Sequence, residues 1–409
     1  MSHDFMKIMT GAPPAPANQV SLKNWRDPGF GRWSFSHVRQ LLPTAPIAPA
    51  PSQASGISGD FASGGVQDLA DLSFTNGSAS YTLDAFLKDS QSDCFMVMQD
   101  GKLAYQWFDG FGAPDRQHIV FSVSKSITSL LTGVLAGQGA IDVDRDISSY
   151  LPEVAGSAYD GATIRHLLDM TIASAFVEDY LDTTGVFMAY RRASAWNPIE
   201  EGQSTKGLRD FLAHLPASDG NHGHRHHYCS THTDMLGWVL ERAAGLPINE
   251  LFSTLLFAPS GTRDEAYITV ESFGAPRVAG GICLTAPDLL RLAEMTRCGG
   301  AVGSRQIVPE SWINDFTGYA DTGAWQRQIG GSRLFVSGNY RSKWYQTGFE
   351  DGEYCAIGIH GQWIWINPKR GVTIIRMASR DMPLDTDTDM VLLEAFKAVA
   401  RAVSQSGYG

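Results

Sequence analysis

The chain has 409 residues, 43% of them hydrophobic and 11% aromatic, and a net charge of −11 from 32 basic and 43 acidic residues. This length and apolar content predict a sizeable core, in two closely packed domains or one large one. The excess of acidic residues, without any run of Lys or Arg, argues against nucleic acid as a partner.

Five scattered cysteines, none in Cys-x-x-Cys spacing, are typical of reduced thiols in a cytoplasmic protein. The N-terminus lacks the basic and apolar regions of a secretory signal, and no apolar run approaches the length that crosses a bilayer. We therefore expect a soluble, cytoplasmic protein with no membrane partner. The sequence leaves homodimerisation open.

Residues 1–60 are rich in proline, alanine and serine. A segment of this composition does not build a core of its own, so we expect an N-terminal extension that wraps the surface. Trp25, Trp33 and Phe35 are its expected anchors.

The next predicted element is a β-hairpin, with strands at 94–99 and 103–108 around the turn residues Asp100-Gly101. A short apolar, β-prone piece then leads into a helix whose apolar residues recur at the spacing that fills one helix face. Those residues are Ile127, Leu130, Leu131, Val134 and Leu135. We expect this helix to end at the glycine-rich residues 137–139.

Ser122 lies where the chain turns from the extended piece into the helix, and Lys125 lies about one helical turn further, on the same side. A serine hydroxyl is a weak nucleophile until a base takes its proton, and a lysine that burial keeps neutral can be that base. The alternative is a serine N-cap followed by a surface lysine. The functional interpretation is favoured because no other lysine follows a serine at this spacing, and because the helix is too apolar for the surface.

A helical turn at 166–170 precedes a long, polar and weakly patterned stretch, 171–227, of the kind that shapes binding sites. Five histidines in or just after it resemble a metal-binding tract: His222, His224, His226, His227 and His232. No acidic residue stands among them at ligand spacing. A solvated, flexible loop is therefore the favoured interpretation, and we expect no metal ion and no cofactor.

The rest of the chain returns from helices to strands. Helices are predicted at 233–245, 248–256 and 287–295, strands at 344–347, 356–360, 362–367 and 372–377, and a closing amphipathic helix at 391–403. Strands at both ends and helices in the middle predict an α/β fold. Its sheet domain would comprise residues 61–165 and 268–409, with a mainly helical domain, 166–267, inserted between them.

A Ser–Lys site also needs a group that passes the proton to the leaving atom. Tyr228, just ahead of the helix predicted at 233–245, is the candidate, and a nearby lysine ammonium would favour its phenolate form. Tyr340-Arg341-Ser342 matches the same short pattern as Tyr228-Cys229-Ser230, so spacing alone does not decide between the tyrosines. The chain has no Gly-x-Ser-x-Gly motif, which argues against an α/β-hydrolase triad.

Several segments carry a shared pattern, in order, along nearly the whole chain: 32–35, 41–44, 121–126, 139–142, 150–153, 178–180, 228–230, 233–234, 279–281 and 358–362. Together they resemble the serine β-lactamase and penicillin-recognising superfamily. The likeness is greatest to its class C-like 6-aminohexanoate-dimer hydrolases and related family VIII-type esterases. This resemblance implies a β-lactamase-like antiparallel sheet flanked by helices, with the inserted helical domain.

The resemblance also implies a role for each matched position. Ser122 would be the acyl-forming nucleophile, Lys125 its base, and Tyr228 the proton donor to the leaving group. The backbone N–H groups of Ser122 and Ile359 would form the oxyanion hole. Tyr180 would lie at the mouth of the cleft.

Three further substrate contacts are expected, from Arg191, Trp344 and His360. Arg191 and its neighbour are basic where an acidic partner would help to bind a substrate amine. The family's third motif, usually Lys-Thr-Gly, falls on Ala356-Ile357-Gly358, which lacks the cation that would hold a β-lactam carboxylate.

The leading functional prediction is a serine hydrolase that cleaves small carboxylic esters or linear amides, such as 6-aminohexanoate oligomers, through an acyl-enzyme on Ser122. The alternative is a penicillin-binding-like fold with a role in binding or assembly and no efficient turnover. The complete Ser–Lys–Tyr set favours the enzyme, because a buried, unpaired lysine is costly to keep without a function.

Overall fold

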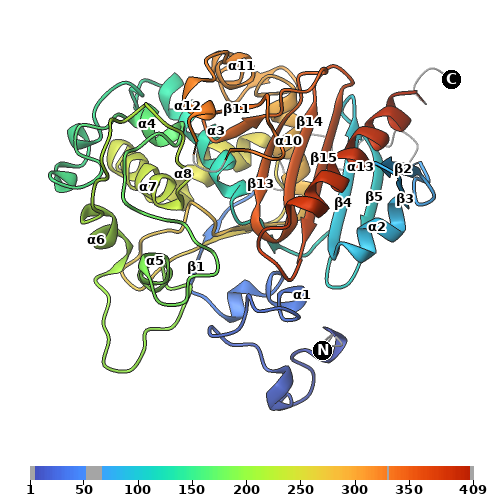
Figure 1. Cartoon of the computed structure of the whole chain (residues 1–409), viewed down its shortest axis with the longest axis horizontal. Coiled ribbons are helices and arrows are strands. Elements are labelled where there is room, and N and C mark those ends of the chain that lie inside the picture. Colours follow the sequence, from blue (N-terminus) through green and yellow to red (C-terminus); the bar gives the residue numbers. More distant parts are fainter. Residues whose placement is uncertain (1–4, 52–66, 329–330, 406–409) are drawn as a thin grey trace.

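A seven-stranded antiparallel sheet lies at the centre of the fold and draws its strands from both ends of the chain (Figure 1). The computed structural model describes residues 5–51, 67–328 and 331–405. In order across the sheet, the strands are β11 (Asn339–Arg341), β12 (Trp344–Gln346), β13 (Tyr354–Gly358), β14 (Gln362–Asn367), β15 (Val372–Ala378), β4 (Ser92–Gln99) and β5 (Lys102–Phe108). Strand β4 thus pairs with β15, with Val97 opposite Ile374. This topology confirms the predicted α/β fold, including the hairpin of β4 and β5.

Helices cover both faces of this sheet. The helices are α1 (Gly31–Ser34), α2 (Leu83–Asp89), α3 (Val123–Gly137), α4 (Ile164–Leu168), α5 (Val186–Ala193), α6 (Gly207–Ala213), α7 (Ser230–Ala244), α8 (Ile248–Leu251), α9 (Ala258–Ser260), α10 (Ala286–Arg297), α11 (Glu310–Gly318), α12 (Gly323–Gln326) and α13 (Thr386–Gln405), with a π-helical turn at Phe252–Phe257. Successive side chains of β4 point to opposite faces, as the strand period requires. Phe95 stacks on Phe396 of α13 with ring centroids 6.1 Å apart. Met96 lies in the other core, which includes Leu289 of α10.

Helix α3 runs through the interior beside the sheet, and every side chain from Val123 to Leu135 is buried. Its polar residues are satisfied locally, since the hydroxyl of Thr128 donates to the Ser124 carbonyl at 2.8 Å. Gly133 is needed where α11 crosses, because a Cβ there would come within 2.6 Å of the Trp312 ring. The helix ends at Gly137, as predicted.

The middle of the chain is more regular than its sequence indicated. The stretch 171–227, predicted to be irregular, contains α5 and α6, and α7 begins at Ser230, ahead of the predicted start at 233. A second sheet, of order β1-β7-β8-β6, was not predicted. Its strands are β1 (Thr44–Ile47), β7 (Ala266–Thr269), β8 (Ile282–Leu284) and β6 (His118–Ile119), and two further pairs are β2 (Ser73–Asn76) with β3 (Ala79–Thr82) and β9 (Ala301–Val302) with β10 (Arg305–Gln306). Elements this short carry too few residues for a periodic pattern.

The N-terminal segment packs along the molecule, and its predicted anchors are buried: Trp25 is 1%, Trp33 6% and Phe35 1% exposed. Strand β1 of this segment pairs with β7. Residues 1–4 and 52–60 of the predicted extension, and 61–66 of the predicted sheet domain, lie outside the described residues. The domain boundaries stay a prediction.

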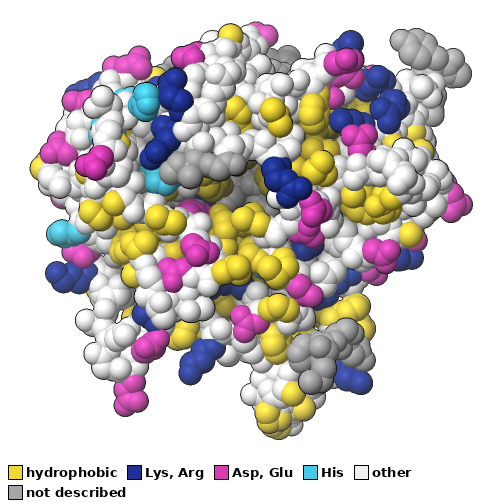
Figure 2. All heavy atoms as spheres, in the orientation of Figure 1, with side chains coloured by type: hydrophobic (Ala, Val, Ile, Leu, Met, Phe, Trp, Pro, Cys, Tyr) yellow, Lys and Arg dark blue, Asp and Glu magenta, His cyan; other side chains and the backbone are white. Residues whose placement is uncertain are grey.

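All five cysteines are free thiols, as expected from their spacing. Across the ranges that the structure describes, no helix has the length and apolar character needed to cross a bilayer. The face seen in Figure 2 carries interspersed acidic and basic side chains, with hydrophobic side chains gathered across its middle.

Candidate active site

The residue before Ser122 has a backbone conformation that side chains rarely adopt. Phe121 has a φ of 42°, in the left-handed region. Its ring is fixed by tertiary packing, stacked on Trp25 at 6.3 Å and edge-to-face with Phe35 at 4.9 Å. This turn delivers Ser122 to the N-terminus of α3, where backbone N–H groups are free of helical partners.

Ser122 and Lys125 contact each other directly. Lys125 is 1% exposed, and its Nζ lies 2.7 Å from Ser122 Oγ and 2.7 Å from the Ala279 carbonyl oxygen. Burial lowers the pKa of Lys125 to about 8; the nearby Arg277 cation also lowers it, while the Glu178 carboxylate opposes the shift. A substantial neutral fraction is therefore available near neutral pH, as a proton acceptor requires.

Tyr228 completes a cluster of three. Its hydroxyl lies close enough to Ser122 for that residue to affect its pKa, and Lys125 Nζ lies 5.1 Å from the centroid of its ring. Tyr340, which matches the same short pattern, lies in β11 with its ring 6.3 Å from that of Tyr228. The expectation of a phenolate at Tyr228 is wrong. Burial and the negative charge of Glu178 raise the pKa of this phenol well above its usual value, so it is a proton donor at rest.

Two carboxylates lie near the cluster, a half-buried one on Glu178 and a buried one on Asp234. Glu178 accepts hydrogen bonds from the backbone N–H and hydroxyl of Ser230, at the start of α7, and from the Tyr180 hydroxyl at 2.6 Å. Asp234 pairs with Arg277 and accepts the Ala279 N–H at 2.8 Å. Because Lys125 donates to the carbonyl of Ala279, Asp234 holds the lysine in place through that residue.

The end of β13 lies against the segment that leads into α3. A Cβ on Gly358 would stand 2.7 Å from the Val120 carbonyl oxygen, so only glycine permits this approach. The result is that Ile359 and Ser122 line the same inner pocket. Two backbone N–H groups at this position can stabilise an anionic oxygen that forms on a substrate carbonyl.

An outer cavity of about 330 Å³ opens next to the inner pocket. Of the predicted substrate contacts, which stay predictions, Tyr180, Arg191 and His360 line it. Trp344 does not. It is 0% exposed and stacks on Phe316 at 5.3 Å in the core, so its prediction as a substrate contact is wrong. Trp344 lies on a strand too short for its sequence to show which of its faces is buried.

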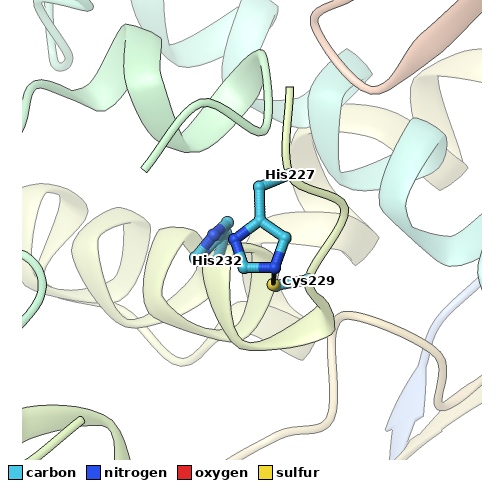
Figure 3. Close-up of side chains that lie close together, drawn as sticks. All are labelled: His227, Cys229 and His232. Carbon is cyan, nitrogen blue, oxygen red and sulfur yellow. Dashed lines mark hydrogen bonds between the residues drawn. The ribbon is translucent and has the colours of Figure 1, made fainter. Parts of the chain in front are cut away.

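The solvated-loop interpretation holds for the first histidines, since His224 is exposed and His222 half-buried outside any helix or strand, but it is wrong for the buried ones that follow. His226 is 6% and His232 0% exposed. Figure 3 shows His227 beside Cys229 and His232, and one ligand atom from each lies within 4.8 Å of the others. These three could hold a soft metal ion, with His227 Nε2 and Cys229 Sγ 3.4 Å apart.

The local charges do not favour a cation in this cluster. A thiolate is the ligand form of cysteine, and burial together with Glu178 raises the pKa of the Cys229 thiol well above its usual value. Burial lowers the pKa of His232, and Lys343 lowers it further, while burial also lowers the pKa of that lysine well below its usual value. The expectation of no metal ion stays a prediction.

The sequence analysis assigned no individual role to several residues of this site. They are Arg26, Trp196, Arg277 and Asp234, and Glu178 was noted only as part of a matched segment. They come from five separate parts of the chain, and none stands at a helical or strand spacing from Ser122. The only available signal was that 178–180, 233–234 and 279–281 carried the family pattern.

The chain is similar to known proteins over most of its length. A family model described as Beta-lactamase matches residues 83–397. The 6-aminohexanoate-dimer hydrolase of Paenarthrobacter ureafaciens is 31% identical over 370 residues, which is 90% of this chain and 90% of that protein.

Two solved structures show the same fold. A candidate 6-aminohexanoate-dimer hydrolase from Bacillus anthracis has a TM-score of 0.85 at 21% identity, over 96% of this chain and 99% of that one. A family VIII carboxylesterase has a TM-score of 0.59 at 16% identity, over 77% of this chain and 96% of that one.

Proposed function

The chain belongs to the beta-lactamase family and is a serine hydrolase, and we propose that it cleaves small carboxylic esters and linear amides through an acyl-enzyme on Ser122. The observation that carries this proposal is the contact of Lys125 Nζ with Ser122 Oγ at 2.7 Å, in surroundings that lower the lysine pKa to about 8. The likeness to a 6-aminohexanoate-dimer hydrolase supports linear amides among the substrates. Ala356 in place of the usual motif lysine argues against β-lactams.

Acylation would begin with neutral Lys125. As Ser122 Oγ attacks the substrate carbonyl carbon, its proton passes to Lys125 Nζ. The carbonyl oxygen becomes negative in the tetrahedral intermediate, where the N–H groups of Ser122 and Ile359 stabilise it. The neutral phenol of Tyr228 then gives its proton to the departing nitrogen or oxygen, the bond to the leaving group breaks, and Lys125 reprotonates the phenolate.

Deacylation repeats these steps with water as the nucleophile. A water molecule attacks the Ser122 ester while its proton passes to the Lys125–Tyr228 pair, and the intermediate collapses to release the acid and Ser122 Oγ, which regains a proton. Each turnover therefore consumes one water molecule, cleaves one ester or amide bond and regenerates the free enzyme.

A fluorophosphonate probe followed by mass spectrometry tests the assignment. We expect one adduct on Ser122, none in Ser122→Ala, and loss of hydrolysis of p-nitrophenyl hexanoate in that variant. Ser126→Ala is the matched control, because Ser126 lies in the same helix but donates to the Lys343 carbonyl at 2.7 Å. A folded, parent protein that takes up no probe and turns over no ester would favour the binding or assembly role instead.

A further inference from the structure

Two arginines in the cleft have no ion-pair partner in the part of the chain that the structure describes. Arg26, from the N-terminal segment, and Arg191, from α5, line both the inner pocket at Ser122 and the outer cavity. Within the described residues, neither has an ion pair. Arg26 donates to the Trp196 carbonyl at 3.3 Å and to the Asn197 side chain. Arg191 donates to the Tyr180 carbonyl at 2.9 Å, and its buried Nε has no hydrogen-bond partner.

The neighbouring carboxylates are engaged elsewhere. Glu178 bonds to Ser230 and to a tyrosine hydroxyl, as described above. Asp182 accepts the backbone N–H of Gly185 at the start of α5, and Asp381 accepts that of Gly29 at 2.7 Å. Asp27 is the acidic residue whose charge acts on Arg26, and its effect is smaller than that of burial and of the other arginines. Among the described residues, neither guanidinium therefore has a carboxylate within ion-pair distance, and the charges of Glu178, Asp182 and Asp179 act on Arg191 only from further away. The donors that remain free are available to a bound anion.

The inner pocket between the arginines and Ser122 is lined by polar side chains, among them Glu178, Ser230 and Arg277, and by apolar ones. Phe121, Phe187 and Trp196 line the inner pocket. A planar guanidinium binds a carboxylate through paired hydrogen bonds, and the contact strengthens where water is excluded. The walls thus fit a short hydrocarbon chain that ends in an anion.

We infer that the substrate is an ester or amide with a carboxylate held by Arg191 and Arg26, joined to the scissile carbonyl group by a short aliphatic chain. This inference rests on the proposed function, because it places the substrate in the cleft of Ser122. A site for a terminal substrate amine needs an acidic side chain, whereas Arg191 is a cation. The inference therefore predicts a preference for the opposite substrate charge.

The test compares three p-nitrophenyl esters that share a leaving group and differ only at the far end of a six-carbon acyl chain. These are hydrogen adipate, with a terminal carboxylate, hexanoate, which is neutral, and 6-aminohexanoate, with a terminal ammonium. We expect kcat/KM to be about tenfold or more higher for the adipate ester than for the neutral ester, the size of one charge-assisted hydrogen-bonded contact. The ammonium ester should be slower than the neutral one. Adipate should also inhibit competitively, and 1,6-hexanediamine should not.

Substitutions of the arginines test which residue causes the preference for the adipate ester. Arg191→Gln should lower kcat/KM much more for the adipate ester than for hexanoate and so remove most of the preference for adipate, whereas Arg191→Lys should keep part of it. Arg192→Gln is the matched control, because Arg192 follows in the same helix but pairs with Glu200. It should keep the full preference. Arg26→Gln supplies a second variant if Arg191→Gln does not fold.

Two failures are distinguishable. Equal rates on the three esters by the parent protein, with hydrolysis still dependent on Ser122, would overturn the carboxylate site and leave the proposed function standing. No hydrolysis of any ester by the folded parent would overturn the proposed function. An adipate preference that survives both Arg191→Gln and Arg26→Gln would assign the anion to another part of the cleft, and would overturn the inference.

Discussion

The active-site cleft is built from two regions of opposite character. The start of α3 supplies Ser122 and Lys125 from adjacent turns of one regular helix, with every side chain from Val123 to Leu135 buried. The segment 171–230 supplies Glu178, Tyr180, Arg191 and Tyr228 from loops and two short helices.

The two regions differ in how their side chains are positioned: by neighbours within one helix in the first, and by contacts with distant parts of the chain in the second. The distance from Ser122 to Lys125 follows from the pitch of a helix, so it survives wherever that helix forms. The position of Glu178 depends instead on its hydrogen bonds to Ser230 across 52 residues. We expect changes in α3 to abolish the chemistry, and changes in the long segment to alter the leaving-group requirement, the pH profile and the substrate preference.

The largest effect is expected from Lys125→Ala. It should lower kcat/KM by about 10³-fold or more for esters and amides alike, because no other base among the described residues contacts Ser122 Oγ. Steady-state kinetics on p-nitrophenyl hexanoate and 6-aminohexanoate dimer would measure this, with circular dichroism to verify folding. Lys343→Met is the matched control: it is also a buried lysine, but its Nζ donates to the Leu167 carbonyl, so the loss should be far smaller. Comparable losses in both variants would mean that burial, and not the contact with Ser122, matters.

Tyr228→Phe should act selectively. An amide nitrogen must be protonated to leave, whereas p-nitrophenolate leaves without help, so we expect amide hydrolysis to fall about 10²-fold and ester hydrolysis less than about tenfold. The raised pKa of Tyr228, which keeps the phenol protonated, makes this donor role available across the working pH range. Tyr340→Phe tests the residue with the same sequence pattern and should leave the amide-to-ester ratio unchanged. Equal losses on both substrates in Tyr228→Phe would exclude it as the leaving-group acid.

The pH dependence of kcat/KM should shift when the charged residues around Lys125 are replaced. Since Lys125 works as the neutral amine and its pKa is about 8, kcat/KM should rise with pH through that value. Glu178 raises this pKa and Arg277 lowers it. Glu178→Gln should therefore shift the rising limb to lower pH, and Arg277→Gln to higher pH, each by about one unit or less. Shifts of the same sign in both variants would contradict the assignment of this limb to Lys125.

The smallest effect is expected from metal removal. His227, Cys229 and His232 lie close enough for a metal ion, but the neutral thiol disfavours one. Exhaustive chelation should leave ester hydrolysis unchanged, and elemental analysis of the purified protein should find no stoichiometric zinc. Activity lost on chelation and restored by zinc would establish a metal site beside Tyr228.

The sequence by itself determined the elements whose signal lies within a few residues. The hairpin around Asp100-Gly101, the helix that carries Ser122 and Lys125, and the strands from Trp344 to Met377 follow from local periodicity and turn chemistry. The matched segments along the chain indicated the family before any contact was known. These features were predictable because regular backbone geometry fixes neighbours three or four positions apart.

The tertiary structure alone decided everything that depends on burial and on distant partners. Trp344 lies in the core and His232 in the interior, although the composition around each suggested a cleft and a solvated loop. The charge state of Tyr228 was reversed by burial and by Glu178, which a local reading beside a lysine could not weigh. The proposed role of Arg191 depends on Arg26, which is 165 positions away in the sequence but lines the same pocket. Electrostatic energy depends on separation in space and on the exclusion of water. Neither can be read from the order of the residues.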